Sequence, residues 1–138
     1  MKFMLRVIVV ACAALAVSAA QSPHSPSELI GTWRGTSTCS DREAAPACKD
    51  EVVIYDFTPG EAAGSVHWKA DKVVNGQRRT MGEFDVVYNP SESCWRADLQ
   101  TPQFNMVWRV SVNGKQLNGS ATLLPDKQIV RKIEARKD

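Results

Sequence analysis

Histidine limits the catalytic chemistry available to this chain. Nucleophilic catalysis of the Ser-His-Asp kind needs a histidine held in a fixed orientation. The sequence has two histidines, His24 in the polar segment 21–28 and His67 in a run of alternating polar and apolar residues. The alternation puts His67 on a solvent-facing strand surface with Lys69 and Asp71, which are ordinary residues for such a surface. The sequence therefore predicts no catalytic triad.

Paired carboxylates are the second possible source of chemistry. Acid–base catalysis needs one carboxylate of the pair to be buried, because burial raises its pKa toward neutrality. Glu83, Asp85 and Asp98 alternate with apolar neighbours, which places all three on solvent-facing surfaces. The sequence also has no glycine-rich phosphate loop and no dinucleotide-binding motif. We expect a protein that is not an enzyme and that uses no cofactor.

The cysteines favour a disulfide over a metal site. The sequence has no Cys-x-x-Cys spacing and only the two separate histidines, so we expect no bound metal. Cys39 and Cys48 flank the segment SDREAAPA between two predicted strands and would face each other if those strands form a hairpin. We favour a Cys39–Cys48 disulfide, with a bridge from either residue to Cys94 as the alternative. Cys94 is then a buried small side chain or, alternatively, a reactive thiol.

The N-terminal residues 1–20 have the plan of a signal peptide. Lys2 and Arg6 provide positive charge, an apolar run follows, and small residues at positions 18–20 suit cleavage. We expect a secreted or periplasmic protein that has no membrane attachment after cleavage. The alternative is cleavage before Cys12, which ends a lipoprotein-like box and would then carry a lipid.

Charge and length restrict the partners and the domain count. Removal of residues 1–20 takes Lys2 and Arg6 from the 17 basic residues, which leaves 15 to match the 15 acidic residues. A neutral chain without basic clusters is not expected to bind nucleic acid. Residues 21–28 are rich in serine and proline and predict a flexible leader. Residues 29–138 are enough for a single domain with one core.

That domain consists of short runs rich in β-branched and aromatic residues, separated by turn-forming residues. Asn75-Gly76 and Asn113-Gly114 are typical of two-residue hairpin turns. No window has a sustained helical period. Eight strands are predicted, over residues 29–38, 50–58, 64–74, 80–88, 94–100, 105–112, 116–124 and 128–136.

The order and alternation of these strands predict an all-β fold, an eight-stranded antiparallel up-and-down barrel. Val66, Trp68 and Ala70 share an apolar face, and later strands repeat the pattern. Eight strands in this order bury one face by closing on themselves, which also removes exposed edges. A two-sheet sandwich is the alternative, but it usually needs longer crossover connections.

The ends of the predicted barrel resemble those of the lipocalin or calycin group of small secreted barrels. The resemblance is carried by Gly31-Thr32-Trp33 at the start of the first strand and by Arg131 on the last strand. It implies that the Arg131 guanidinium stacks on the Trp33 indole and closes the barrel, a cation–π contact. Bacterial protease-inhibitor barrels of similar size are a second resemblance, through layout, one small disulfide loop and an N-terminal leader.

The barrel interior is the remaining candidate site. Its large inward-facing side chains are predicted to be Tyr55, Trp68, Phe84, Tyr88, Trp95 and Trp108. They either line a pocket for a small apolar or amphipathic ligand or fill the interior completely. The first possibility makes the protein an exported ligand-binding protein. The second makes it a solid barrel that acts as a protein-interaction or inhibitor module through its leader and disulfide loop.

Overall fold

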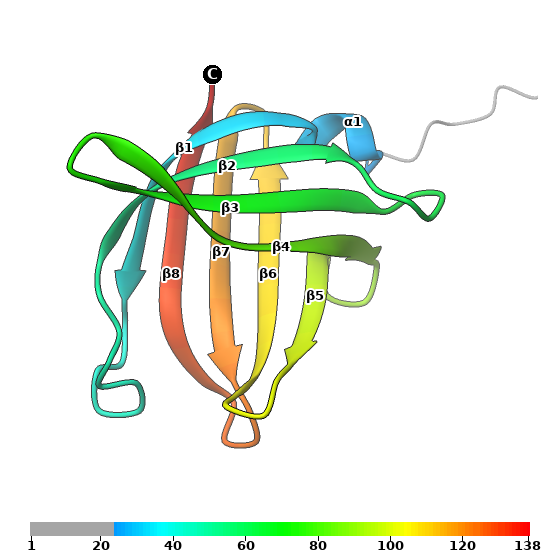
Figure 1. Cartoon of the computed structure of the whole chain (residues 1–138). Coiled ribbons are helices and arrows are strands. Elements are labelled where there is room, and N and C mark those ends of the chain that lie inside the picture. The colour runs from blue at the N-terminus through cyan, green and yellow to red at the C-terminus, as the bar shows by residue number, and fades with distance from the viewer. Residues whose placement is uncertain (1–23) are drawn as a thin grey trace, which may run out of the picture.

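The protein is a closed barrel of eight antiparallel strands in sequence order, which confirms the predicted fold class (Figure 1). The computed structural model describes residues 24–138, so the predicted signal peptide and Cys12 lie outside it. The strands are β1 (Gly31–Cys39), β2 (Glu51–Pro59), β3 (Val66–Val74), β4 (Gln77–Asn89), β5 (Cys94–Gln100), β6 (Asn105–Asn113), β7 (Gln116–Leu123) and β8 (Gln128–Lys137).

Two tight turns fix the pairing of neighbouring strands. Asn75 and Gly76 both have positive φ (53° and 75°), and they connect β3 to β4. Gly114 has φ 60° in the turn between β6 and β7. Both turns stand where the sequence predicts hairpins, because asparagine and glycine tolerate this backbone conformation. The β3–β4 turn is so short that β4 begins at Gln77, ahead of its predicted start at residue 80.

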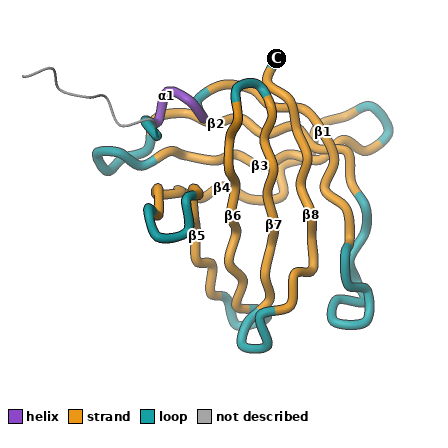
Figure 2. The backbone as a smooth tube through the Cα atoms, turned by 180° about the vertical axis from the view of Figure 1, so that it is seen from behind, coloured by secondary structure: helices purple, strands orange, loops and turns teal. Residues whose placement is uncertain are grey.

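The barrel closes between β1 and β8 and is least continuous between β4 and β5. Strands β1 and β8 pair from Trp33↔Lys137 to Cys39↔Arg131. Gly35 lies at this seam, and a Cβ there would collide with the backbone carbonyl of Glu134 on β8. Strands β4 and β5 pair only over residues 87–89 and 94–96, so they diverge beyond that point (Figure 2).

One end of the barrel is closed by α1 (Pro26–Leu29), a short helix that leads into β1 (Figure 1). A proline at the start of a helix is favourable because its missing N–H needs no partner there. The side chain of Leu29 is fully buried, and its carbonyl accepts a hydrogen bond from Trp33 Nε1 at 2.8 Å. Residues 26–28, which the sequence assigns to a flexible leader, are therefore in a helix that packs against the barrel. We call this end the closed end.

The opposite end carries three loops, at residues 40–50, 101–104 and 124–127, and we call it the open end (Figure 1). The Cys39–Cys48 disulfide lies here, which confirms the predicted bridge across the β1–β2 loop. Cys94 is a free, buried cysteine, and this burial raises the pKa of its thiol. A thiol in such surroundings is less reactive than an exposed one.

Alternation along the strands predicts most inward and outward positions, with one correction at Asp71. Its predicted solvent-facing side chain is only 3% exposed. Arg78, at the start of β4, covers it and donates to Asp71 Oδ2 from Nε at 2.9 Å. Pairing of β3 with β4 also shifts between Ala70 and Asp71. An acidic residue on the outer face of a strand is thus buried by an ion pair from the neighbouring strand.

Candidate functional site

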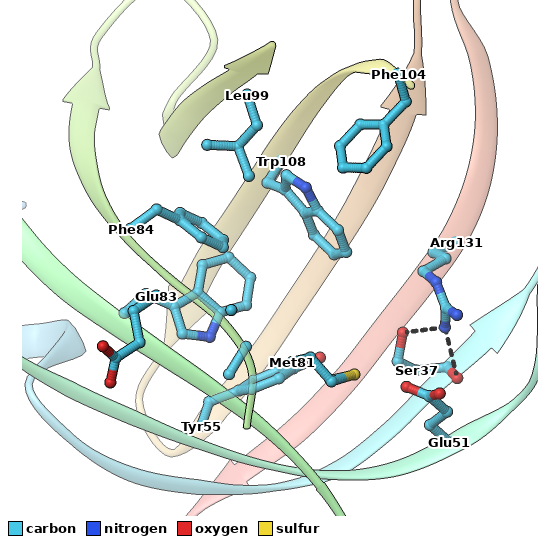
Figure 3. A pocket seen from close by; sticks show the side chains of 13 residues that line it. Ser37, Glu51, Tyr55, Met81, Glu83, Phe84, Leu99, Phe104, Trp108 and Arg131 are labelled. Carbon is cyan, nitrogen blue, oxygen red and sulfur yellow. Dashed lines mark hydrogen bonds between the residues drawn. The ribbon is translucent and has the colours of Figure 1, made fainter. Parts of the chain in front are cut away.

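A cavity of about 350 Å³ occupies the half of the barrel next to the open end (Figure 3). Its size is within the range of small-molecule sites in proteins. It lies between the end of β1, the start of β2 and the diverging strands β4 and β5. The lining residues are Ser37, Glu51, Tyr55, Trp68, Ala70, Met81, Gly82, Glu83, Phe84, Leu99, Phe104, Trp108 and Arg131.

Aromatic side chains form most of the apolar wall. The rings of Trp68 and Phe84 have centroids 4.9 Å apart, and those of Trp68 and Trp108 are 5.8 Å apart in an edge-to-face arrangement. Trp68 is 1% exposed, whereas Phe84 and Trp108 are half-buried. Met81 and Phe104 are each more than 40% exposed and line the mouth of the cavity. This wall offers a large apolar contact surface to a bound molecule.

Polar groups gather on the opposite side of the cavity, and we call Ser37, Glu51, Tyr55 and Arg131 the polar pole. Arg131 donates from Nη1 to Ser37 Oγ at 3.0 Å and from Nη2 to the Lys49 carbonyl oxygen at 3.1 Å. Figure 3 shows the guanidinium directed toward Ser37 and Glu51. Burial raises the pKa of Tyr55, so its hydroxyl remains protonated at neutral pH.

Two buried polar atoms of the lining residues have no hydrogen-bond partner among residues 24–138. One is Glu51 Oε2; the other carboxylate oxygen of Glu51 accepts from Lys72 Nζ at 3.2 Å. The second is Trp68 Nε1, a donor. Buried polar groups are normally hydrogen-bonded, and an unsatisfied one is costly. Both residues line the cavity, and the described protein atoms leave this acceptor and this donor unused.

Of the six predicted ligand-binding residues, the structure brings four together around the cavity, namely Tyr55, Trp68, Phe84 and Trp108. The other two lie at the closed end. Trp95 donates from Nε1 to Glu28 Oε1 of α1 at 3.1 Å. Tyr88 stacks on His24 with ring centroids 4.4 Å apart. Both face inward as expected, but Trp95 contacts α1 and Tyr88 contacts His24, which precedes the helix.

The predicted closure of the barrel by Arg131 is wrong, because Lys137 lies over Trp33 instead. Lys137 Nζ is 5.4 Å from the centroid of the Trp33 ring. Antiparallel pairing sets Trp33 opposite Lys137 and moves Arg131 to the far end of β1, opposite Cys39. Gly31 has φ 136°, and a Cβ there would collide with the Lys137 side chain. The closed end is thus sealed by a Gly-x-Trp and a basic residue, as the resemblance implies, but by a different basic residue.

Of the polar pole, only Tyr55 is predicted from the sequence as a ligand-binding residue, and no binding role is predicted for Ser37, Glu51 or Arg131. Ser37 follows Trp33 at even spacing along β1, and Arg131 precedes Ile133 and Ala135 at even spacing along β8. Even spacing places them on the inner face of their strands. Polar residues at inward positions of β1 and β8, the strands that close the barrel, are the sequence signal that indicates this site.

The described residues outside the cavity form no second candidate site. His67 pairs with Asp85 at 2.7 Å on the outer face of the barrel, on exposed side chains. No three histidine, cysteine, aspartate or glutamate side chains between His24 and Asp138 are grouped as metal ligands.

No protein-family model matches the chain, no curated protein matches it significantly, and no solved structure is significantly similar to it. Within residues 24–138, no helix is long and apolar enough to span a membrane.

Proposed function

We propose that the protein is an exported barrel that binds an amphipathic small molecule in the cavity at its open end. The observation that carries this proposal is the division of the cavity into an aromatic wall and a polar pole. An apolar molecule alone would leave Glu51 Oε2 and the Arg131 guanidinium without new partners. A molecule with an apolar body and a polar head contacts both sides of the cavity.

Export is supported by the Cys39–Cys48 disulfide. Disulfides persist mainly in oxidising compartments outside the cytosol. The signal-peptide pattern over residues 1–20 is the second support.

The cavity also bears on the competing hypothesis of a solid barrel that acts only through protein contacts. Aromatic residues fill the closed half, but the open half has about 350 Å³ of space. Residues 26–28 of the predicted leader pack against the barrel as part of α1. The ligand-binding hypothesis uses both of these features, and we therefore prefer it.

Native mass spectrometry of the purified, oxidised protein tests the proposal, with the denatured mass as reference. We expect the native mass to exceed the denatured mass by a few hundred daltons, roughly the mass of a ligand that fits such a cavity. A ligand lost in purification is replaced by adding anilinonaphthalene sulfonate, whose fluorescence reports binding to apolar cavities. Equal masses together with no dye binding to the folded protein would contradict the proposal.

A matched pair of variants places the binding site. Trp108→Ala removes part of the aromatic wall and should weaken dye binding by about tenfold or more, since an aromatic contact of this size contributes over 1 kcal/mol. Val87→Ala removes an apolar side chain that is 58% exposed and is not among the cavity-lining residues. Equal dye affinities in the two variants would place the dye outside the cavity.

A further inference from the structure

Arg131 differs from the other partly buried arginines of the described chain in having no acidic partner. Arg96 and Arg109 are also partly buried, and both form ion pairs with Glu92. Arg131 donates only to neutral oxygens, those of Ser37 and Lys49. No carboxylate among residues 24–138 lies within ion-pair distance of it. A charge withdrawn from water without a counter-ion is unfavourable.

The charges around Arg131 leave an excess of one positive charge. Glu51 is the acidic group of the polar pole, and Lys72 neutralises it through the contact to Oε1. Arg131 is then the uncompensated ion of the polar pole. Glu83 also lines the cavity, but its exposed carboxylate points away from this pole (Figure 3). A singly charged anion balances the site, whereas a doubly charged phosphate ester would bring a second negative charge next to Glu51. A guanidinium also matches the planar pair of oxygens of a carboxylate.

Glu51 sets a second requirement for the head group of the ligand. Its Oε2 atom is a buried acceptor without a protein partner in the described chain. Glu51 and Ser37 are directly opposite each other on β2 and β1, and Ser37 Oγ accepts from Arg131. Glu51 and Arg131 thus lie on either side of one serine (Figure 3). A head group held by Arg131 places its neighbouring atoms within reach of Glu51.

We propose that the ligand is an amphipathic carboxylate whose head also carries a hydroxyl or amide N–H, with Arg131 holding the carboxylate and Glu51 Oε2 accepting from that donor. This inference rests on the proposed function and names the chemical class of its ligand. The apolar chain lies against Trp68, Phe84 and Trp108.

Calorimetric titration of the purified protein with four probes of equal chain length tests the inference. The probes are decanoate, β-hydroxydecanoate, decanol and decylammonium, at neutral pH. We expect decanoate to bind about 10- to 100-fold more tightly than decanol, the range for hydrogen bonds to a charged group. The hydroxyl of β-hydroxydecanoate should add roughly a further 3- to 10-fold, as one neutral donor does. Decylammonium should bind most weakly.

Two variants of β8 separate a specific contact from general charge. Arg131→Met removes the cation inside the cavity and should bring the affinities for decanoate and decanol close to parity. Lys132→Met removes a cation from the next residue, which is exposed on the outer face, and should retain the preference. Circular dichroism is used to check that both variants are folded. Arg131→Lys, which keeps the charge but loses the planar fork, serves if the methionine variant does not fold.

Glu51→Met tests the contact between Glu51 and the hydroxyl group of the ligand, by comparing the affinities of two probes. The affinity ratio of β-hydroxydecanoate to decanoate should fall to about one, because both probes experience the same change of charge. Glu134→Met is the control, since the Glu134 side chain is exposed on the outer face of β8 and is not among the cavity-lining residues. That control should keep the ratio of the unmodified protein.

The outcomes separate the inference from the proposed function. Decanol that binds as tightly as decanoate, or decylammonium that binds best, overturns the inference but leaves a ligand-binding cavity. A ratio of one in the unmodified protein overturns the role of Glu51. Failure of all four probes, with no ligand mass in the native spectrum, overturns the inference and the proposed function together.

Discussion

The two ends of the barrel use the same residue type in opposite ways. At the closed end, the indole N–H groups of Trp33 and Trp95 donate to Leu29 and Glu28, and both side chains are almost fully buried. At the open end, Trp68 Nε1 has no partner in residues 24–138, and Trp108 is half-buried at the cavity. The tryptophans of the closed end thus stabilise the fold through buried hydrogen bonds. Those of the open end provide an apolar surface and, within the described chain, an unpaired N–H group at the cavity.

The basic residues of β8 show the same contrast. Lys137 lies over the ring of Trp33, and Arg131 lies at the cavity without an acidic partner. Both face inward on one strand. The position of each residue along the barrel axis decides whether it contributes to the stability of the protein or to its binding site. The closed end should therefore respond to mutation with a loss of stability and the open end with a loss of binding.

The largest expected effect comes from exchanging one tryptophan at each end for alanine. Trp95→Ala should lower the free energy of unfolding by about 3 to 5 kcal/mol, because it empties a packed site and leaves Glu28 without its donor. Trp108→Ala enlarges a cavity that already exists and should cost less stability while it weakens ligand binding. Urea unfolding followed by circular dichroism measures both. Equal losses of stability would remove the distinction between the two ends.

The disulfide at the open end should have the next largest effect on stability. Replacing both Cys39 and Cys48 by serine opens a loop with a sequence separation of 9 residues. The chain-entropy model gives a loss of about 2 to 3 kcal/mol in the free energy of unfolding. Urea unfolding of the double variant, compared with the oxidised protein, measures it. A loss below about 1 kcal/mol would show that the loop is held by its other contacts, including that of Arg42 to Asp50.

A smaller effect is expected from the cation over Trp33. Lys137→Met removes the charge but keeps most of the aliphatic contact, so the free energy of unfolding should fall by about 1 kcal/mol. Lys132→Met, on the outer face of the same strand, is the matched control and should change it very little. A larger loss in the control would mean that the net charge, and not the contact with Trp33, sets the stability.

The smallest expected effect concerns Asp56 on β2, which forms an ion pair with Arg78 at the start of β4. Burial alone would raise the pKa of Asp56, but hydrogen bonds from Thr32 and Arg78 hold it below its usual value. Because the folded pKa is lower than the unfolded pKa, this contribution to stability is complete above the unfolded value of about 4. It is lost as the pH falls through the folded pKa.

Asp56→Asn isolates this contribution. The variant should lose less stability than the unmodified protein between pH 6 and pH 3, as measured by urea unfolding across that range. Identical pH dependence in both proteins would show that the Arg78 contact with Asp56 contributes nothing to stability.

The sequence predicts the strands, their order and their inward faces, since these depend on local alternation and on turns such as Asn75-Gly76. It does not predict the height of a side chain along the barrel axis. That height depends on strand tilt and on pairing register, which are set by distant strands. Arg131 and Lys137 have the same inward parity, so only the register of β1 with β8 shows which one reaches Trp33.

The same limit explains why the sequence does not predict the position of Tyr88 and Trp95 at the closed end. It also explains the wrong prediction that Asp71 is exposed. Tyr88 and Trp95 were correctly placed on inner faces, but their position at the closed end follows from contacts with His24 and α1. The burial of Asp71 depends on Arg78 from the next strand, a contact that alternation within a single strand does not contain.

The indole N–H resonances of the four tryptophans give the most direct test of the difference between the two ends. Two of these groups lie at the closed end and two belong to residues that line the cavity. Proton–nitrogen spectra recorded during titration with β-hydroxydecanoate should show the signals of Trp68 and Trp108 shifting while those of Trp33 and Trp95 stay in place. Shifts of Trp33 and Trp95 without shifts of the other pair would contradict the account and place binding at the closed end.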